Sequence, residues 1–125
     1  MEGGGRYPLG VPGDPLDRLR KICAQLPEAK EGTTVHHPSF NVRGKTFVML
    51  VGDDYPSLWV KCTREEQQEL IATDDDRFFV PPYLGPKGWI GIRLGGRTDW
   101  QEATEIITDG YRLAAPKRLL RLLGD

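Results

Sequence analysis

Two tryptophans and two cations stand at alternating positions in two stretches that have the pattern of β-strands. Trp59 and Lys61 alternate with apolar residues in one stretch, and Trp89 and Arg93 do so in the other. Successive side chains of a strand point to opposite faces, so an inward-facing apolar set sends these four residues to the opposite face. Aromatic rings beside cations suit base stacking with contacts to phosphate, and they equally suit a hot spot for a protein partner. The alternative is that residues 81–87 cover the tryptophans and the cations only cap the edge of that cluster.

Four further residues extend this candidate surface. Arg43, Lys45 and Lys87 would lie at its rim, and Tyr83 stands in the proline-containing segment before Trp89. Charge is also uneven along the chain, because residues 63–77 hold two basic and six acidic side chains, whereas residues 78–97 hold three basic ones and no acidic one. The candidate set for nucleic-acid or partner binding is Arg43, Lys45, Trp59, Lys61, Tyr83, Lys87, Trp89 and Arg93.

The overall charge excludes a strongly basic nucleic-acid-binding protein. The chain has 125 residues with a net charge of -1 and a pI near 6.1. No global positive field therefore draws it to nucleic acid or to anionic lipid, and such binding must come from a local patch.

Signatures of catalysis and of metal binding are weak. His36 and His37 are adjacent, so in an extended segment they point to opposite sides and cannot chelate one ion together. Asp74, Asp75 and Asp76 lack the alternate spacing and the glycine of a calcium loop. An enzyme would need side chains such as Tyr83, His37 or Lys61 to converge in a pocket. We expect no catalytic residue, no metal and no cofactor.

Helix signals and strand signals alternate along the first half of the chain. Asp14 has the features of an N-cap with Pro15 at the first helical position, and the helical pattern then runs to Pro27. Residues 40–42, a turn at Gly44 and residues 45–51 predict a β-hairpin. Residues 58–62 alternate as a third strand.

The second half begins with a capping-box spacing at Thr63 and Glu66, which predicts a short helix that ends near Thr73. Residues 78–80 are a candidate fourth strand at an edge, and residues 89–94 are a clearer strand. Thr98 and Gln101 have the same capping-box spacing, which predicts a helix as far as Ala115 with an apolar face of Trp100, Ala103, Ile107 and Leu113. A last amphipathic turn or two follows Pro116.

Together these elements predict an α+β fold in two layers. We expect an antiparallel sheet of about five strands with helices on one face, in the order α-β-β-β-α-β-β-α with an extra C-terminal helical turn. Residues 1–13 are rich in glycine and proline and predict a disordered tail, so a single domain would span residues 14–123. The expected core contains Leu19, Ile22 or Cys23, Phe47, Val60, Ile90, Ile92 and Ile107.

The cysteine residues and the apolar content of the sequence indicate the cellular compartment of the protein. Cys23 and Cys62 each lie between apolar neighbours, which favours buried free thiols and a reducing cytoplasm. No apolar run approaches the roughly 18 residues of a membrane span, and the start lacks the apolar core of a signal peptide. We expect a cytoplasmic protein without a membrane partner, with the monomer favoured.

Several separated motifs occur in an order that resembles the YjbR/MmcQ family of small bacterial proteins, over about residues 16–120. The motifs are residues 37–42 (HPSFNV), 44–47 (GKTF), 58–61 (LWVK), 78–83 (FFVPPY), 88–90 (GWI) and 110–118 (GYRLAAPKR). The resemblance implies a fold of helix, three strands, helix, two strands and helix, related to the CyaY (frataxin-like) and secretion-chaperone architectures. It also implies DNA binding through a double-wing arrangement of hairpins.

Two function classes follow from these observations. The first is a non-enzymatic DNA-binding module whose affinity is weak and mostly independent of base sequence, because only about four to six cations lie near the face. The second is a protein-interaction or chaperone-like adaptor that uses the same face and tolerates a neutral chain.

Overall fold

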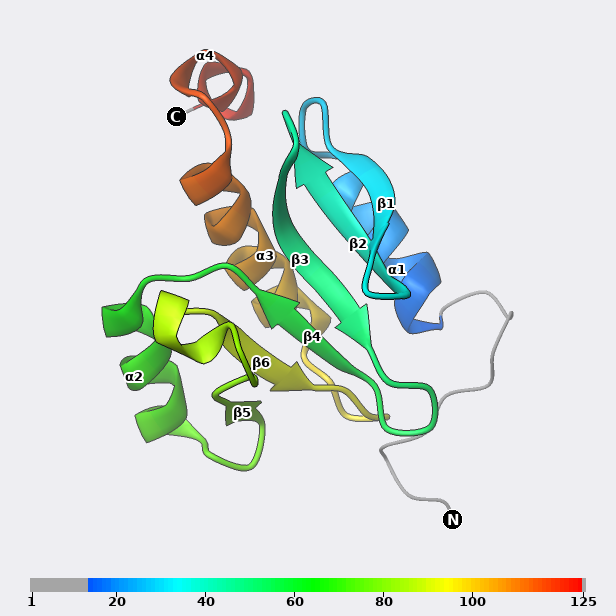
Figure 1. Cartoon of the computed structure of the whole chain (residues 1–125), viewed down its shortest axis with the longest axis vertical. Coiled ribbons are helices and arrows are strands. Elements are labelled where there is room, and N and C mark those ends of the chain that lie inside the picture. Colours follow the sequence, from blue (N-terminus) through cyan, green and yellow to red (C-terminus); the bar gives the residue numbers. More distant parts are fainter. Residues whose placement is uncertain (1–13, 125) are drawn as a thin grey trace.

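The protein forms a single sheet with helices on one side, as a computed structural model shows for residues 14–124 (Figure 1). The elements are α1 (Pro15–Cys23), β1 (Lys30–Thr34), β2 (His37–Val42), β3 (Lys45–Val51), β4 (Ser57–Val60), α2 (Arg64–Thr73), β5 (Phe78–Phe79), the 3-10 helix η1 (Gly85–Lys87), β6 (Ile90–Arg93), α3 (Trp100–Ala114), α4 (Lys117–Leu120) and the 3-10 helix η2 (Arg121–Leu123). The predicted disordered tail over 1–13 lies outside the described residues.

Every neighbouring pair of strands in the sheet is antiparallel, in the order β1-β2-β3-β4-β6-β5. The helices α1 and α3 lie behind the sheet in Figure 1, and α3 contacts β3 and β4. The predicted α+β class, the antiparallel sheet and the helices on one face are therefore confirmed. The sheet has six strands rather than about five.

The additional strand is β1, which the sequence pattern did not indicate. Its residues KEGTT contain no large apolar side chain, so they lack the alternation that marks a half-buried strand. The strand forms because it pairs along its whole length with β2, from Lys30 opposite Asn41 to Thr34 opposite His37. It lies at the edge of the sheet, where polar residues are tolerated.

The helix starts confirm two of the three predicted caps. The Asp14 carboxylate accepts a hydrogen bond from the Asp17 N–H at 2.8 Å, and the Thr63 hydroxyl accepts one from the Glu66 N–H at 3.1 Å. These contacts satisfy amide donors that the first turn of a helix leaves without partners.

The third predicted cap is wrong by one residue. Asp99, not Thr98, is the N-cap of α3, and its carboxylate accepts from the Glu102 N–H at 3.0 Å. The Thr98 hydroxyl instead accepts from the Gly95 N–H at 2.7 Å and closes the loop before the helix. Both residue types cap well, so spacing alone did not distinguish two consecutive candidates.

The core lies between the sheet and the helices. Leu19, Cys23, Phe47, Val60, Ile90, Ile92 and Ile107 are all buried, as expected. The rings of Phe47 and Tyr111 meet edge to face with centroids 5.5 Å apart. Leu113 was expected on the buried face of α3 but is exposed, because the buried stripe passes through Ile107, Gly110 and Tyr111 instead.

Both cysteines are free and buried, as expected from their apolar neighbours. Burial raises the pKa of the Cys23 thiol to about 12. Burial, together with the nearby Glu66 carboxylate, raises the pKa of the Cys62 thiol to about 12. Neither thiol is a nucleophile at neutral pH, because the reactive form is the thiolate.

Candidate functional site: the open sheet face and its cleft

The strand register defines the side chains on the face of the sheet that the helices leave open. Met49 pairs with Trp59, Trp59 with Gly91, and Gly91 with Phe79, which forms one row across four strands. Ser57 and Arg93 pair in the adjacent row. The alternate residues Leu58, Val60, Ile90 and Ile92 are buried against the helices. We call the side that contains Trp59, Phe79 and Arg93 the open face.

Gly91 has no side chain, and the space above its backbone is occupied by an aromatic ring of the open face. The Phe79 ring lies over Gly91 and leaves no room for a Cβ at that position. The Arg93 guanidinium lies over the same Phe79 ring, 4.7 Å from its centroid. The indole Nε1–H of Trp59 donates to the Ser57 hydroxyl at 3.0 Å. Two partly exposed aromatic rings thus flank a glycine and lie beside an arginine.

Acidic side chains are missing from the strands on this face. Glu31 is the one acidic residue in β1–β6, and it pairs with Phe40, whose side chain belongs to the core beneath the helices. Its carboxylate accepts from the Arg20 Nε and Nη2 at 2.8 and 2.9 Å. The strand residues of the open face therefore carry positive or neutral side chains, although the isoelectric point is acidic.

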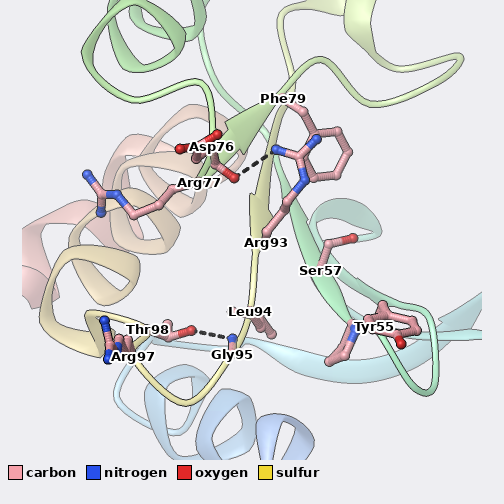
Figure 2. A pocket seen from close by; sticks show the side chains of 11 residues that line it. Tyr55, Ser57, Asp76, Arg77, Phe79, Arg93, Leu94, Gly95, Arg97 and Thr98 are labelled. Carbon is pink, nitrogen blue, oxygen red and sulfur yellow. Dashed lines mark hydrogen bonds between the residues drawn. The ribbon is translucent and has the colours of Figure 1, made fainter. Parts of the chain in front are cut away.

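A cleft of about 750 Å³ opens at the end of the sheet beside Arg93 (Figure 2). It lies where β4 begins and β6 ends. Its walls come from the turn before β4, the loop before β5 and the loop before α3, and its lining residues are Tyr55, Pro56, Ser57, Asp76, Arg77, Phe79, Arg93, Leu94, Gly95, Arg97 and Thr98. The volume falls within the range of small-molecule sites.

Three arginines line the cleft, and they differ in whether an acidic side chain compensates their charge. Arg77 donates to the Asp74 carboxylate at 2.7 Å and also bonds the Glu102 carboxylate. These contacts raise the pKa of Arg77, and the Arg77 guanidinium lowers the pKa of Asp74. Arg97 is exposed and has no hydrogen bond or ion pair within residues 14–124. The cleft therefore contains one compensated arginine, together with Arg93 and Arg97.

Comparison with known families identifies the family of the chain that forms this cleft and open face. A model of the YjbR family matches residues 24–113, which is most of the chain. The chain belongs to the YjbR family. The expected resemblance is thereby confirmed. No curated protein matches the sequence significantly.

A solved structure supports the fold of this YjbR-family chain. The crystal structure of the Deinococcus radiodurans protein DR2400, with a DUF419 family domain, superposes with a TM-score of 0.74 at 22% sequence identity. The alignment covers 93% of this chain and 92% of that one. At this level of identity the similarity shows a shared fold.

The structure brings together only part of the predicted site. Trp59 and Arg93 lie on the open face, and Lys61 follows β4 directly, with its N–H donating to the Phe47 carbonyl at 2.9 Å. Trp89 is only 5% exposed, so the expectation that it shares an exposed surface with Trp59 is wrong. Alternation fixes the face of the sheet to which a side chain points, but not whether other atoms cover it.

Trp89 is part of a buried contact with α2. The Gln67 side-chain amide is 2% exposed and donates to the Trp89 carbonyl at 2.7 Å and to the Gly85 carbonyl at 3.1 Å. This contact fastens the segment between β5 and β6 to the helix. Trp89 is a structural residue, in line with the alternative that the tryptophan is covered.

Tyr83 and Lys87 lie on the segment that joins β5 to β6. Tyr83 is 92% exposed and has a left-handed φ of 65°, and Lys87 ends η1. The Arg64 guanidinium reaches the Pro86 carbonyl at 3.4 Å, so this segment lies against the start of α2. Neither residue belongs to the rows of the open face.

Arg43 and Lys45 lie at the opposite end of the sheet from the cleft. Lys45 begins β3 and pairs with Val42, whereas the row of Ser57 and Arg93 includes Val51 at the end of that strand. Six residues of strand separate the two rows by ~20 Å. The Arg43 Nε donates to the Glu28 carboxylate at 2.6 Å, which lowers the pKa of Glu28 and compensates the charge of Arg43.

Sequence reasoning missed Phe79, Tyr55 and Arg97. Phe79 was visible as part of an edge strand, but its position over Gly91 depends on a pairing between β5 and β6 that no local pattern specifies. Tyr55 and Arg97 lie in loops, whose positions depend on the sheet that they connect. A three-arginine cleft is therefore a product of the tertiary fold.

The side chains that an enzyme would need lie outside this cleft. His37, Lys61 and Tyr83, the candidates for an enzyme, are all absent from the lining of the cleft. Within residues 14–124 no cluster of three or more histidine, cysteine, aspartate or glutamate side chains has a metal-binding arrangement. In the same part of the chain, no helix is both long and apolar enough to cross a membrane.

Proposed function

We propose that this YjbR-family protein is a non-enzymatic module that binds single-stranded DNA weakly and without strong sequence preference. The observation that supports this function best is the open face itself, where Trp59 and Phe79 flank Gly91 beside Arg93. Every base has a π-face, so stacking on such a platform tolerates any sequence.

The shape of the face favours a single strand over a duplex. Proteins that recognise double-stranded DNA insert an α-helix or a β-ribbon into a groove of the duplex. The bases of a single strand are instead free to stack on a sheet surface. Arg93 and Lys61 lie near the aromatic pair and supply cations for phosphates, and no strand residue of the open face is acidic.

The number of free cations sets the expected affinity. Two cations on the face give few phosphate contacts, so we expect a dissociation constant on the order of 10⁻⁴ to 10⁻⁶ M at physiological salt. For two phosphate contacts to a single strand, the logarithm of the binding constant falls with the logarithm of salt concentration with a slope of roughly -1.4.

A protein-interaction role is the second candidate, and one observation favours it. The segment after β5 exposes Val80 by 51% and Tyr83 by 92%, and an exposed aromatic residue is typical of an interface hot spot. The buried free thiols of Cys23 and Cys62 suit a reducing cytoplasm under either function.

A titration with a short oligothymidine strand tests the DNA-binding function. We expect saturable binding at low salt, weakened at physiological salt, with quenching of Trp59 fluorescence. Lys61→Gln should weaken binding about fivefold, or roughly 1 kcal/mol. Trp59→Phe should remove most of the quenching.

Lys117→Gln is the matched control, because it removes one exposed charge on α4, away from the open face. It should leave the affinity unchanged. Absence of saturable binding at low salt would contradict the DNA-binding function and favour the adaptor.

A further inference from the structure

We propose that the cleft at the end of the sheet binds a terminal phosphate monoester attached to a nucleoside. This inference rests on the proposed function, because Arg93 and Phe79 belong both to the cleft and to the open face. The ligand is the phosphorylated end of a bound strand or a free mononucleotide, which share this chemistry.

Arg93 is held in place before any ligand arrives. Its Nη1 donates to the Asp76 carbonyl at 3.0 Å and to the Asp75 carbonyl at 3.4 Å, while its plane stacks on Phe79 (Figure 2). Its Nε–H and Nη2–H groups have no acceptor within residues 14–124. A guanidinium that is already oriented loses less side-chain entropy when it binds an anion.

Arg97 supplies the second cation. It lies in the loop before α3, lines the same cleft and has no acidic partner in the described part of the chain. Figure 2 shows Arg97 and Tyr55 on the two sides of Leu94 and Gly95, with Arg93 above them. Both residues line the cleft. Their guanidinium groups point to different parts of it in Figure 2, so contact of both with one phosphate requires the exposed Arg97 side chain to turn toward Arg93.

Two available guanidinium groups favour a terminal phosphate over an internal one. A phosphate monoester carries about -1.5 to -2 charges at neutral pH, whereas each internal phosphodiester carries one. The additional charge and the additional free oxygen allow a second arginine contact. A 5′- or 3′-phosphate therefore gains more from this cleft than a phosphate within a strand.

The remaining lining suits the nucleoside. Tyr55 is 75% exposed and offers a ring face for a base. The Ser57 hydroxyl accepts from the Trp59 indole and the Thr98 hydroxyl accepts from the Gly95 N–H, so each retains its own hydrogen for donation. Two hydroxyl donors and an aromatic ring thus line the cleft together with the two arginines.

Substitution of Asp76 should change the affinity for phosphate in the opposite direction to substitution of an arginine. It lines the cleft and is exposed, and its backbone carbonyl, not its carboxylate, binds Arg93. Asp76→Asn removes the one acidic side chain of the lining and keeps the backbone contact. This substitution should strengthen phosphate binding, whereas Arg97→Gln should weaken it.

The experiment compares oligothymidine strands that end in a 5′-phosphate, a 3′-phosphate or hydroxyls, together with thymidine monophosphate and thymidine. We expect a strand with a terminal phosphate to bind about fivefold more tightly than the hydroxyl strand, a difference of roughly 1 kcal/mol. Arg97→Gln should abolish this preference and Asp76→Asn should increase it. Arg121→Gln, which removes an exposed charge on η2, should leave it unchanged.

Each outcome separates this inference from the proposed function. Equal affinity for phosphorylated and hydroxyl strands would overturn the cleft assignment while the DNA-binding function stands. A preference that persists in Arg97→Gln would also overturn it. Binding of thymidine monophosphate without binding of any strand would support the cleft and contradict the DNA-binding function.

Discussion

The ring of Phe79 lies directly on the backbone of Gly91, in the space that a Cβ would occupy. This contact brings an edge strand of two residues, β5, against β6 and holds an aromatic ring on the open face. Arg93 then stacks on that ring. The Phe79–Gly91 contact thus links the fold of the sheet edge to both proposed binding surfaces.

Gly91→Ala should displace Phe79 and destabilise the protein by about 1–3 kcal/mol, because an overpacked site must shift its neighbours. Urea denaturation measures the loss. Gly32→Ala is the matched control, since Gly32 lies in the sheet where a Cβ would meet the Asn41 side chain only at an ordinary 3.6 Å. Equal stability of the two variants would contradict the packing argument.

Gln67→Met should destabilise the protein by about 1–3 kcal/mol, because it leaves the buried carbonyls of Gly85 and Trp89 without their donor. Hydrogen exchange should also show faster opening of residues 81–89. Gln101→Met is the control, because Gln101 is exposed on α3. Unchanged exchange in the Gln67 variant would mean that the amide does not fasten this segment.

Tyr111→Phe tests a buried titratable group. The Tyr111 hydroxyl donates to the Pro27 carbonyl at 2.7 Å, so its loss should cost about 1 kcal/mol at neutral pH. Burial raises the pKa of Tyr111. Above the ordinary tyrosine pKa of about 10, the unfolded chain therefore releases this proton first and native stability falls as pH rises.

The phenylalanine variant lacks that titration. Its stability deficit relative to the native protein should shrink as the pH rises above about 10, as followed by urea denaturation. Tyr83→Phe, at a site that is 92% exposed, controls for loss of an ordinary hydroxyl and should leave stability at neutral pH unchanged. A constant deficit across this range would contradict the role of burial.

Asp99→Ala should destabilise α3 by about 1 kcal/mol, since the Asp99 carboxylate caps the helix at the Glu102 amide. Glu105→Ala, at an exposed position within α3, should change stability by less than about 0.5 kcal/mol. Thermal unfolding compares the two. A larger effect from Glu105 would contradict the assigned cap.

Sequence patterns predict the parts of this fold in which local chemistry decides the structure. The N-caps at Asp14 and Thr63 and the buried set around Phe47 and Val60 follow from side-chain type and spacing. The strand β1 does not, because its polar residues adopt a strand through pairing with β2. Backbone pairing at a sheet edge needs no periodic apolar pattern in the edge strand itself.

The same distinction between local and tertiary properties applies to the candidate site. Alternation correctly places Trp59 and Arg93 on the side of the sheet opposite the core, because side-chain direction is a local property. Exposure is a tertiary property, so Trp89 has the right pattern and is nevertheless buried. The arginines Arg77 and Arg97 line one cleft only because the loops before β5 and α3 both lie at this end of the sheet.

The most direct test of the proposed function is the mapping of an oligothymidine titration on the backbone amide resonances and the tryptophan indole resonances of the protein. We expect shift changes that saturate together at Trp59, Lys61, Phe79, Gly91 and Arg93, including the Trp59 indole N–H that donates to Ser57. Residues of α1, which lies behind the sheet in Figure 1, should not respond. Shifts confined to the helical side, or no saturable shift at low salt, would contradict DNA binding by the open face.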